Sequence, residues 1–185
     1  MKKKIFIFFF LFIFNNSSIA SMKDDIIFNL KNTNNLTFNF IQNINEKEED
    51  GECTISYPKK INCKYNTLNK KIMVSNGKSL VIKNLVNNQY YRYPLNRTPL
   101  NFILDKDYLI SQLIKLEGRV IDKRYLNFTL INENNKINVF FSKKTLDLVG
   151  WQTEDVYQNL VITFISQIKI NQEIDQNIFD LPKPN

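Results

Sequence analysis

The chain has 185 residues and a formal net charge of +7, with no histidine and two cysteines. The lack of histidine excludes a Ser-His-Asp triad, a Cys-His pair and a histidine-ligated metal, and two cysteines are too few for a four-thiolate zinc or iron–sulfur site. The four glycines and five prolines also argue against a glycine-rich phosphate loop, a collagen-like repeat or a long flexible linker.

The first twenty residues have the features of a secretory signal peptide. Three lysines precede an unbroken apolar run from Ile5 to Phe14, and the small residues Ser18 and Ala20 follow. The apolar run is too short to cross a bilayer, which needs roughly 20 residues. We therefore expect cleavage after Ala20 and export, which makes nucleic acid a poor candidate partner. Loss of the three lysines lowers the net charge to +4.

The segment 22–31 predicts a helix. Ile26, Ile27 and Leu30 recur at helical spacing, and Asp24 and Asp25 are expected in the first turn, where acidic residues stabilise a helix.

From residue 36 onward, apolar and polar residues alternate, as in antiparallel strands with one buried face. The clearest examples are Leu36–Phe40, Leu126–Leu130, Ile137–Phe141 and Leu160–Ile170, with shorter ones at Ile72–Val74, Leu80–Ile82 and Tyr91–Tyr93. Turn signals rich in Asn, Ser and Gly separate these segments. We predict ten or eleven strands, which is enough to curl a single sheet toward a barrel.

The two cysteines lie in a predicted hairpin that turns around Pro58–Lys60. The geometry of this hairpin permits a cross-strand disulfide between Cys53 and Cys63, and export favours the disulfide over two buried free thiols. The spacing differs from Cys-x-x-Cys, so a redox-active role is not expected.

Thr98 and Pro99 predict the N-cap and first position of a short helix. The helix is apolar nearly all round, which suits packing against or into a sheet. Its apolar residues are Leu100, Phe102, Ile103 and Leu104. The next segment, Asp107–Leu116, is compatible with a helix or a strand.

No pair of carboxylates stands out as catalytic. Glu46, Glu48, Glu49 and Asp50 fit a solvated loop, and the remaining acidic pairs follow the short helix or occupy a turn. A glycosidase needs two convergent carboxylates, and nothing distinguishes these from surface charge. We therefore expect no enzyme, no catalytic residue, no metal and no cofactor.

Five segments carry a pattern that resembles one known family. They are Leu36–Gln42, Gly51–Pro58, Val74–Leu80, Thr98–Leu100 and Ile178–Pro182. In order, they are similar to the first strand, the Gly-x-Leu-x-x-x-Arg-Pro strand, the Val-Ser-Asp-Gly hairpin, the Thr-Pro lid segment and the closing Phe-x-x-Pro strand of the outer-membrane lipoprotein carrier family, LolA. Their order and spacing cover nearly the whole predicted mature chain.

The resemblance implies a mainly β fold, an incomplete antiparallel β-barrel covered by an α-helical lid, in a single domain over residues 21–185. It also implies a periplasmic carrier that holds the acyl chains of lipoproteins in an apolar cavity and moves them from the inner to the outer membrane. The implied partners are acylated lipoproteins, an inner-membrane lipoprotein-releasing ABC transporter and, if present, an outer-membrane receptor. We expect a monomer.

On this basis we expect the cavity to be lined by Phe38, Phe40, Ile55, Val74, Leu80, Ile82 and Phe128, and the lid to be formed by Leu100, Ile103 and Leu104. Each of these residues taken alone fits a core position equally well, so the prediction concerns the group. The family tethers its lid through an Arg directly before the strand-ending Pro. Tyr57 stands at that position, and its hydroxyl is a candidate for a weaker or different latch.

Two alternatives stay open. One is a periplasmic lipid-binding or lipid-sensing protein on the same fold, which should carry a second domain or a lipidated cysteine. The other is a secreted carbohydrate-active β-protein, which needs two carboxylates on inward strand faces. An apolar hollow favours the carrier and an acidic cleft favours the enzyme.

Overall fold

The computed structural model describes residues 19–184 except 69, 133–134 and 155–157. Most of the expected signal peptide, residues 1–18, therefore lies outside the described residues. Ile19 and Ala20 form the start of the first helix. None of the helices in the described part of the chain is long and apolar enough to cross a membrane.

The described residues form three α-helices, two short 3-10 helices and eleven strands. The helices are α1 (Ile19–Asn32), η1 (Leu95–Arg97), α2 (Leu100–Leu104), α3 (Lys106–Lys115) and η2 (Gln176–Phe179). The first six strands are β1 (Asn35–Ile44), β2 (Lys47–Ser56), β3 (Lys60–Tyr65), β4 (Lys71–Asn76), β5 (Ser79–Asn84) and β6 (Tyr90–Pro94). The other five are β7 (Arg119–Ile121), β8 (Tyr125–Asn132), β9 (Asn135–Ser142), β10 (Leu148–Glu154) and β11 (Leu160–Ile170).

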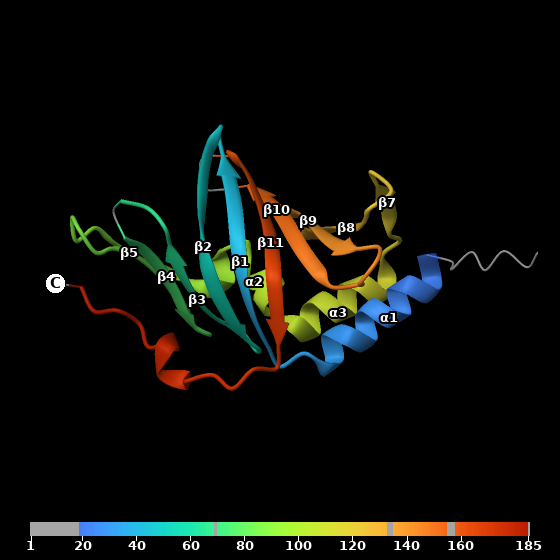
Figure 1. The fold of residues 1–185 in the computed structure, drawn as a ribbon, viewed down its shortest axis with the longest axis horizontal. Coiled ribbons are helices and arrows are strands. Elements are labelled where there is room, and N and C mark those ends of the chain that lie inside the picture. The colour runs from blue at the N-terminus through green and yellow to red at the C-terminus, as the bar shows by residue number, and fades with distance from the viewer. Residues whose placement is uncertain (1–18, 69, 133–134, 155–157, 185) are drawn as a thin grey trace, which may run out of the picture.

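All eleven strands belong to one antiparallel sheet, in the order β6-β5-β4-β3-β2-β1-β11-β10-β9-β8-β7. Strands β1 to β6 form the N-terminal half of the sheet, and η1, α2 and α3 connect β6 to β7. Strands β7 to β11 form the C-terminal half, and β11 pairs with β1. The sheet stays open, with β6 and β7 at its edges. The predicted incomplete barrel with helices on one side is confirmed (Figure 1).

The main core lies between the three α-helices and the face of the sheet turned toward them, which we call the inner face. The inner-face residues alternate along each strand, as in β1, where Leu36, Phe38 and Phe40 are buried. From the helices, the fully buried residues Ile26, Ile103, Leu104, Leu109 and Leu113 pack into the same cluster. Helices α1 and α3 lie side by side across the strands of the C-terminal half (Figure 1).

The helix ends differ from the sequence predictions in two places. Helix α1 begins at Ile19, so Asp24 and Asp25 lie beyond its first turn. Thr98 does not cap α2 with its side chain; the N-cap of α2 is Pro99, and the Thr98 hydroxyl donates to the Leu95 carbonyl at 2.8 Å. A short polar side chain such as Thr98 bonds whichever backbone carbonyl its local turn presents, and here that is the carbonyl of Leu95, the first residue of η1.

The segment that sequence periodicity left open is helical. Helix α3 covers Lys106–Lys115 and buries Leu109, Ile110 and Leu113. The Asp105 carboxylate caps this helix by accepting from the backbone N–H of Tyr108 at 3.1 Å. This cap satisfies one of the backbone donors that a helix start leaves unpaired.

After β11 the chain crosses the opposite, outer face of the N-terminal half of the sheet (Figure 1). Phe179 of η2 is buried, and the carbonyl of Ile178 accepts from the Asn62 amide at 2.6 Å. The Lys83 ammonium, buried on this face, donates to the Lys183 carbonyl at 2.9 Å. The terminal segment therefore covers a second apolar surface, on the side of the sheet away from the helices.

Candidate functional site

Five of the seven predicted cavity residues lie buried on the inner face of the sheet. They are Phe38, Phe40, Ile55, Leu80 and Phe128. They belong to strands β1, β2, β5 and β8, which lie in both halves of the sheet. Ile82 shares the face of Leu80 but is only half-buried.

The prediction that Val74 lines the cavity is wrong, because Val74 lies on the outer face of the sheet. Register decides this: Val74 pairs with Asn62 and Val81, whereas its neighbour Ser75 pairs with the core residue Ile61. Residues paired across neighbouring antiparallel strands share a face, so Val74 and Val81 face away from the helices. Both are buried on the outer face, where the terminal segment crosses. The Val74 side chain is therefore buried in the second apolar layer, between the outer face of the sheet and the terminal segment.

Helix α2 occupies the inner face as the predicted lid. Ile103 and Leu104 are fully buried and Phe102 is nearly so, while Leu100 lies at the margin, partly buried against the core. A remaining hollow of about 20 Å³ between α1 and the sheet, lined in part by Leu30 and Phe141, is too small for an acyl chain. Among the described residues, the side chains of α2 therefore fill the part of the inner face that this helix covers.

The inner face becomes exposed toward the edge strand β6. Leu80 of β5 is 5% exposed, whereas its partner on β6, Tyr93, is 38% exposed. Tyr91, the β6 partner of Ile82, is 48% exposed. Met73 and Tyr65 continue this surface and pack partly against the core. An apolar margin at the edge strand β6 therefore joins the buried core to solvent.

The lid is tied to the sheet at Lys59, in the turn between β2 and β3. The backbone N–H of Lys59 donates to the carbonyl of Leu104 at 2.9 Å. The Lys59 ammonium also lies 2.9 Å from the Asp105 carboxylate. Nothing in the sequence pattern singled out Lys59, because its role depends on a turn meeting a helix more than forty positions later.

Tyr57 does not form the hydrogen-bonded latch that we expected of it. Its hydroxyl is buried and has no hydrogen-bond partner among the described residues. Its ring packs against the core, and the Lys106 ammonium lies 5.4 Å from the ring centre. Burial raises the pKa of the Tyr57 phenol, so this group stays a neutral donor. The Tyr57 hydroxyl is an unused donor beside the lid.

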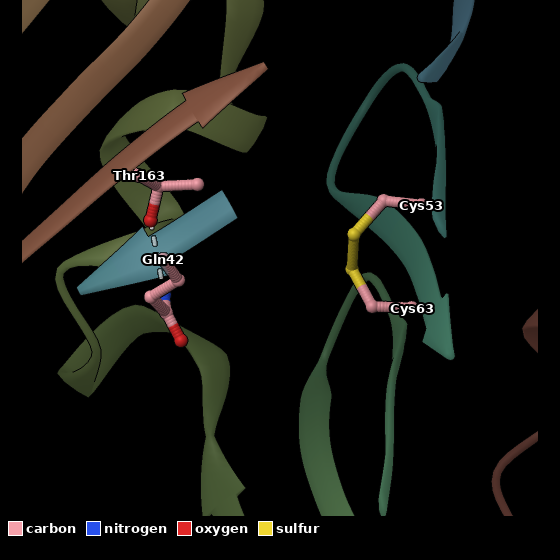
Figure 2. The surroundings of a disulfide bond; sticks show 4 residues. All are labelled: Gln42, Cys53, Cys63 and Thr163. Atoms are coloured by element: carbon pink, nitrogen blue, oxygen red, sulfur yellow. Dashed lines mark hydrogen bonds between the residues drawn. A yellow bond between two sulfur atoms is a disulfide. The ribbon is translucent and has the colours of Figure 1, made fainter. Parts of the chain in front are cut away.

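The two cysteines stand directly opposite each other on β2 and β3 and form a disulfide (Figure 2). Both side chains are buried on the inner face, next to Ile55 and Ile61. On the neighbouring strand pair, the Gln42 amide donates to the Thr163 hydroxyl at 3.0 Å and joins β1 to β11 (Figure 2). These bonds join strand to strand and reinforce the frame of the sheet.

The ion pair and the helix cap at Asp105 make separable contributions to lid closure. We expect Asp105→Ala to lower the free energy of unfolding by about 1–2 kcal/mol, because it removes both the cap and the ion pair. The control Lys59→Met removes only the partly exposed ion pair and should cost at most about 1 kcal/mol, since the Lys59 backbone bond remains. Chemical denaturation measures both values. An equal loss in the two variants would contradict the role of the cap.

An open, curved antiparallel sheet with helices packed into its inner face defines a class of half-barrel proteins. The chain belongs to a family of this class, since the profile of the outer membrane lipoprotein carrier protein LolA matches residues 31–182. No curated protein sequence matches the chain.

A solved structure shares the fold at low sequence identity, and a second is similar over most of its length. An uncharacterized conserved protein from Thermus thermophilus matches with a TM-score of 0.53 and 9% identity, over 90% of this chain and 96% of that one. A LolA superfamily protein from Nitrosomonas europaea matches with a TM-score of 0.46 and 10% identity, over 88% of this chain and 96% of that one.

Proposed function

We propose that this protein is a periplasmic carrier that receives the acyl chains of lipoproteins in the space that α2 fills in the closed structure. The observation that carries the proposal is the apolar lid seated in an apolar inner face, in a chain of the LolA family. On this proposal the chain loses a signal peptide after Ala20 and functions as a single domain, as a monomer, and without catalysis.

Helix α2 is suited to give way to a ligand. It has only five residues, and helices shorter than about 12 residues are marginal unless tertiary packing holds them. Exposing Phe102, Ile103 and Leu104 costs roughly 5–9 kcal/mol in total, at about 1.5–3 kcal/mol for each side chain. An acyl chain regains about 0.8 kcal/mol per buried methylene, so roughly 6–11 methylenes offset that cost.

The uncovered margin beside β6 offers a route of entry. An acyl chain placed against Tyr91 and Tyr93 contacts Ile82 and Leu80 next, because these pairs are adjacent in the sheet. Further advance displaces α2 from the inner face. The unpartnered hydroxyl of Tyr57 then serves as a donor for an ester or amide carbonyl of the ligand.

A carrier needs the closed state when it is empty. An open apolar groove exposed to water is an aggregation hazard, so the lid protects the protein between cargoes. Transfer follows a gradient of affinity, from the inner-membrane ABC transporter to this carrier and then to an outer-membrane receptor, if one is present.

Depletion of the protein in its host tests the proposal. We expect lipoproteins destined for the outer membrane to accumulate in the inner membrane, and fractionation with immunoblotting measures this. Re-expression of the wild-type chain should restore sorting. Normal sorting after depletion would rule out the carrier role, and it would favour a lipid-binding or lipid-sensing protein if the purified chain still binds an acylated peptide.

A further inference from the structure

The outer face of the C-terminal half carries an aromatic cluster that the core does not explain. Tyr125, Phe140 and Phe164 come from β8, β9 and β11. The rings of Phe140 and Phe164 stack at 5.9 Å between centres and 18° between planes, and Tyr125 lies 6.1 Å from Phe164. They meet beside Gly150 of β10, where an added Cβ would lie 3.2 Å from the Phe164 ring. Phe164 remains 41% exposed, so the cluster presents an aromatic surface to solvent.

A hollow of about 270 Å³ adjoins this cluster and is rich in amide groups. The amides of Asn127, Asn138 and Gln152 line it, together with the guanidinium of Arg119 and the carboxylate of Asp122. Planar amides and carboxylates both accept hydrogen bonds from hydroxyl groups, and amides also donate to them. The hollow therefore combines an aromatic wall with several groups that recognise hydroxyls.

Asn127 supplies an independent observation, a buried acceptor without a partner among the described residues. Its side chain is 2% exposed, and its amide nitrogen donates to the Thr129 hydroxyl at 3.4 Å, which in turn donates to Asn138 at 2.7 Å. Because the amide nitrogen of Asn127 makes this hydrogen bond, the other amide atom, Oδ1, is a buried acceptor with no partner among the described residues. An unpaired buried acceptor is unfavourable, so a hydroxyl donor entering this hollow gains a hydrogen bond that the protein has left unmade.

A second hollow, of about 690 Å³, lies on the other side of Tyr125 and Phe164 and is basic. Lys123 and Arg124 line it from the turn before β8, and Lys143 and Lys144 line it from the turn after β9. The backbone N–H of Lys143 donates to the Arg124 carbonyl at 2.7 Å and holds the two turns together. None of the described residues that line this hollow is acidic, so its field favours an anion.

We propose that this outer-face site binds a saccharide that carries a carboxylate or phosphate group. The apolar face of a sugar ring lies on Phe164 and Tyr125, its hydroxyls bond the amides around Asn127, and its anionic group faces the basic turns. The site lies on the side of the sheet opposite the lid, so it is independent of the proposed acyl-carrier function.

Calorimetric titration of the purified protein tests the site with four probes: a disaccharide containing glucuronic acid, its neutral glucose counterpart, glucose 6-phosphate and inorganic phosphate. We expect the two anionic sugars to bind at least tenfold more tightly than either the neutral sugar or inorganic phosphate. Equal binding of inorganic phosphate would mean a plain anion site and would overturn the proposal, as would the absence of saturable sugar binding.

Two variants and a control locate the binding. Phe164→Ala removes the exposed ring shared by both hollows and should weaken binding of the anionic sugars about tenfold. The double variant Lys143→Ala/Lys144→Ala should remove the preference for anionic over neutral sugar. The control Ile131→Ala shortens an exposed apolar residue of β8 that lines neither hollow, and it should bind as the wild type does. Unchanged affinity in Phe164→Ala would contradict the proposed site.

Discussion

Replacing Leu104 with alanine is expected to lower the free energy of unfolding by about 2–5 kcal/mol and, at the same time, to raise the affinity for an acylated peptide at least tenfold. The two effects have one cause. Leu104 is fully buried in the closed structure, so its truncation weakens the packing of α2 in the inner face. The free energy needed to displace α2 is then smaller, so a ligand that binds only the open state binds more tightly.

The matched control is Phe128→Ala on the sheet side of the same cluster. Phe128 is fully buried, with its ring centre 5.9 Å from that of Phe141, and its truncation should cost about 3–5 kcal/mol. Because Phe128 belongs to the wall rather than to the lid, its loss should not raise acyl affinity. Denaturant titration and binding of a fluorescent triacylated peptide measure the two quantities. If Leu104→Ala lowers the affinity as well as the stability, Leu104 is an ordinary core residue and the lid mechanism is wrong.

Removing the disulfide is expected to lower the free energy of unfolding by about 2–3 kcal/mol and the melting temperature by about 4–12 °C. The loop that Cys53 and Cys63 close spans ten positions, and the cross-link restricts the unfolded chain more than the folded hairpin. The double variant Cys53→Ala/Cys63→Ala makes this change and removes only the two sulfur atoms from the inner face. Calorimetry or circular dichroism during heating measures the shift.

Reductant provides the control for this second prediction. Treatment with a thiol reductant should lower the melting temperature of the wild type toward that of the double-alanine variant and leave the variant unchanged. Acyl-peptide affinity should change little in either case, because the disulfide joins two strands of the sheet and is not part of α2. If the reduced and oxidised wild type have the same melting temperature, the stabilisation assigned to the disulfide is wrong.

Much of the sheet was predictable because alternation is a local property. Along β1, β8 and β9 one set of alternate residues is apolar and the other is mostly polar, so the buried face follows from the sequence alone. The disulfide hairpin was equally accessible, since a short turn between two strands sets the register of both cysteines. The apolar character of α2 likewise indicated a helix seated in the sheet.

Strand β4 shows where local reasoning fails. Its two faces are both partly apolar, with Ile72 and Val74 on one and Met73 on the other, and the larger apolar pair suggested the wrong inner face. Apolar residues are tolerated on both faces of β4 because η2 and the chain beyond it cover the outer face. That cover comes from residues about a hundred positions later, so periodicity within β4 cannot report it.

The sequence by itself determined the strands, most of the inner face, the cysteine pairing and an apolar lid, because each rests on neighbours a few residues apart. Only the tertiary structure decided that Lys59 rather than Tyr57 holds the lid, that Val74 belongs to a second layer, and that Tyr125, Phe140 and Phe164 gather on the outer face. The physical reason is common to all three. Which side chains meet across separate strands and turns depends on register and closure, and these are properties of the whole sheet.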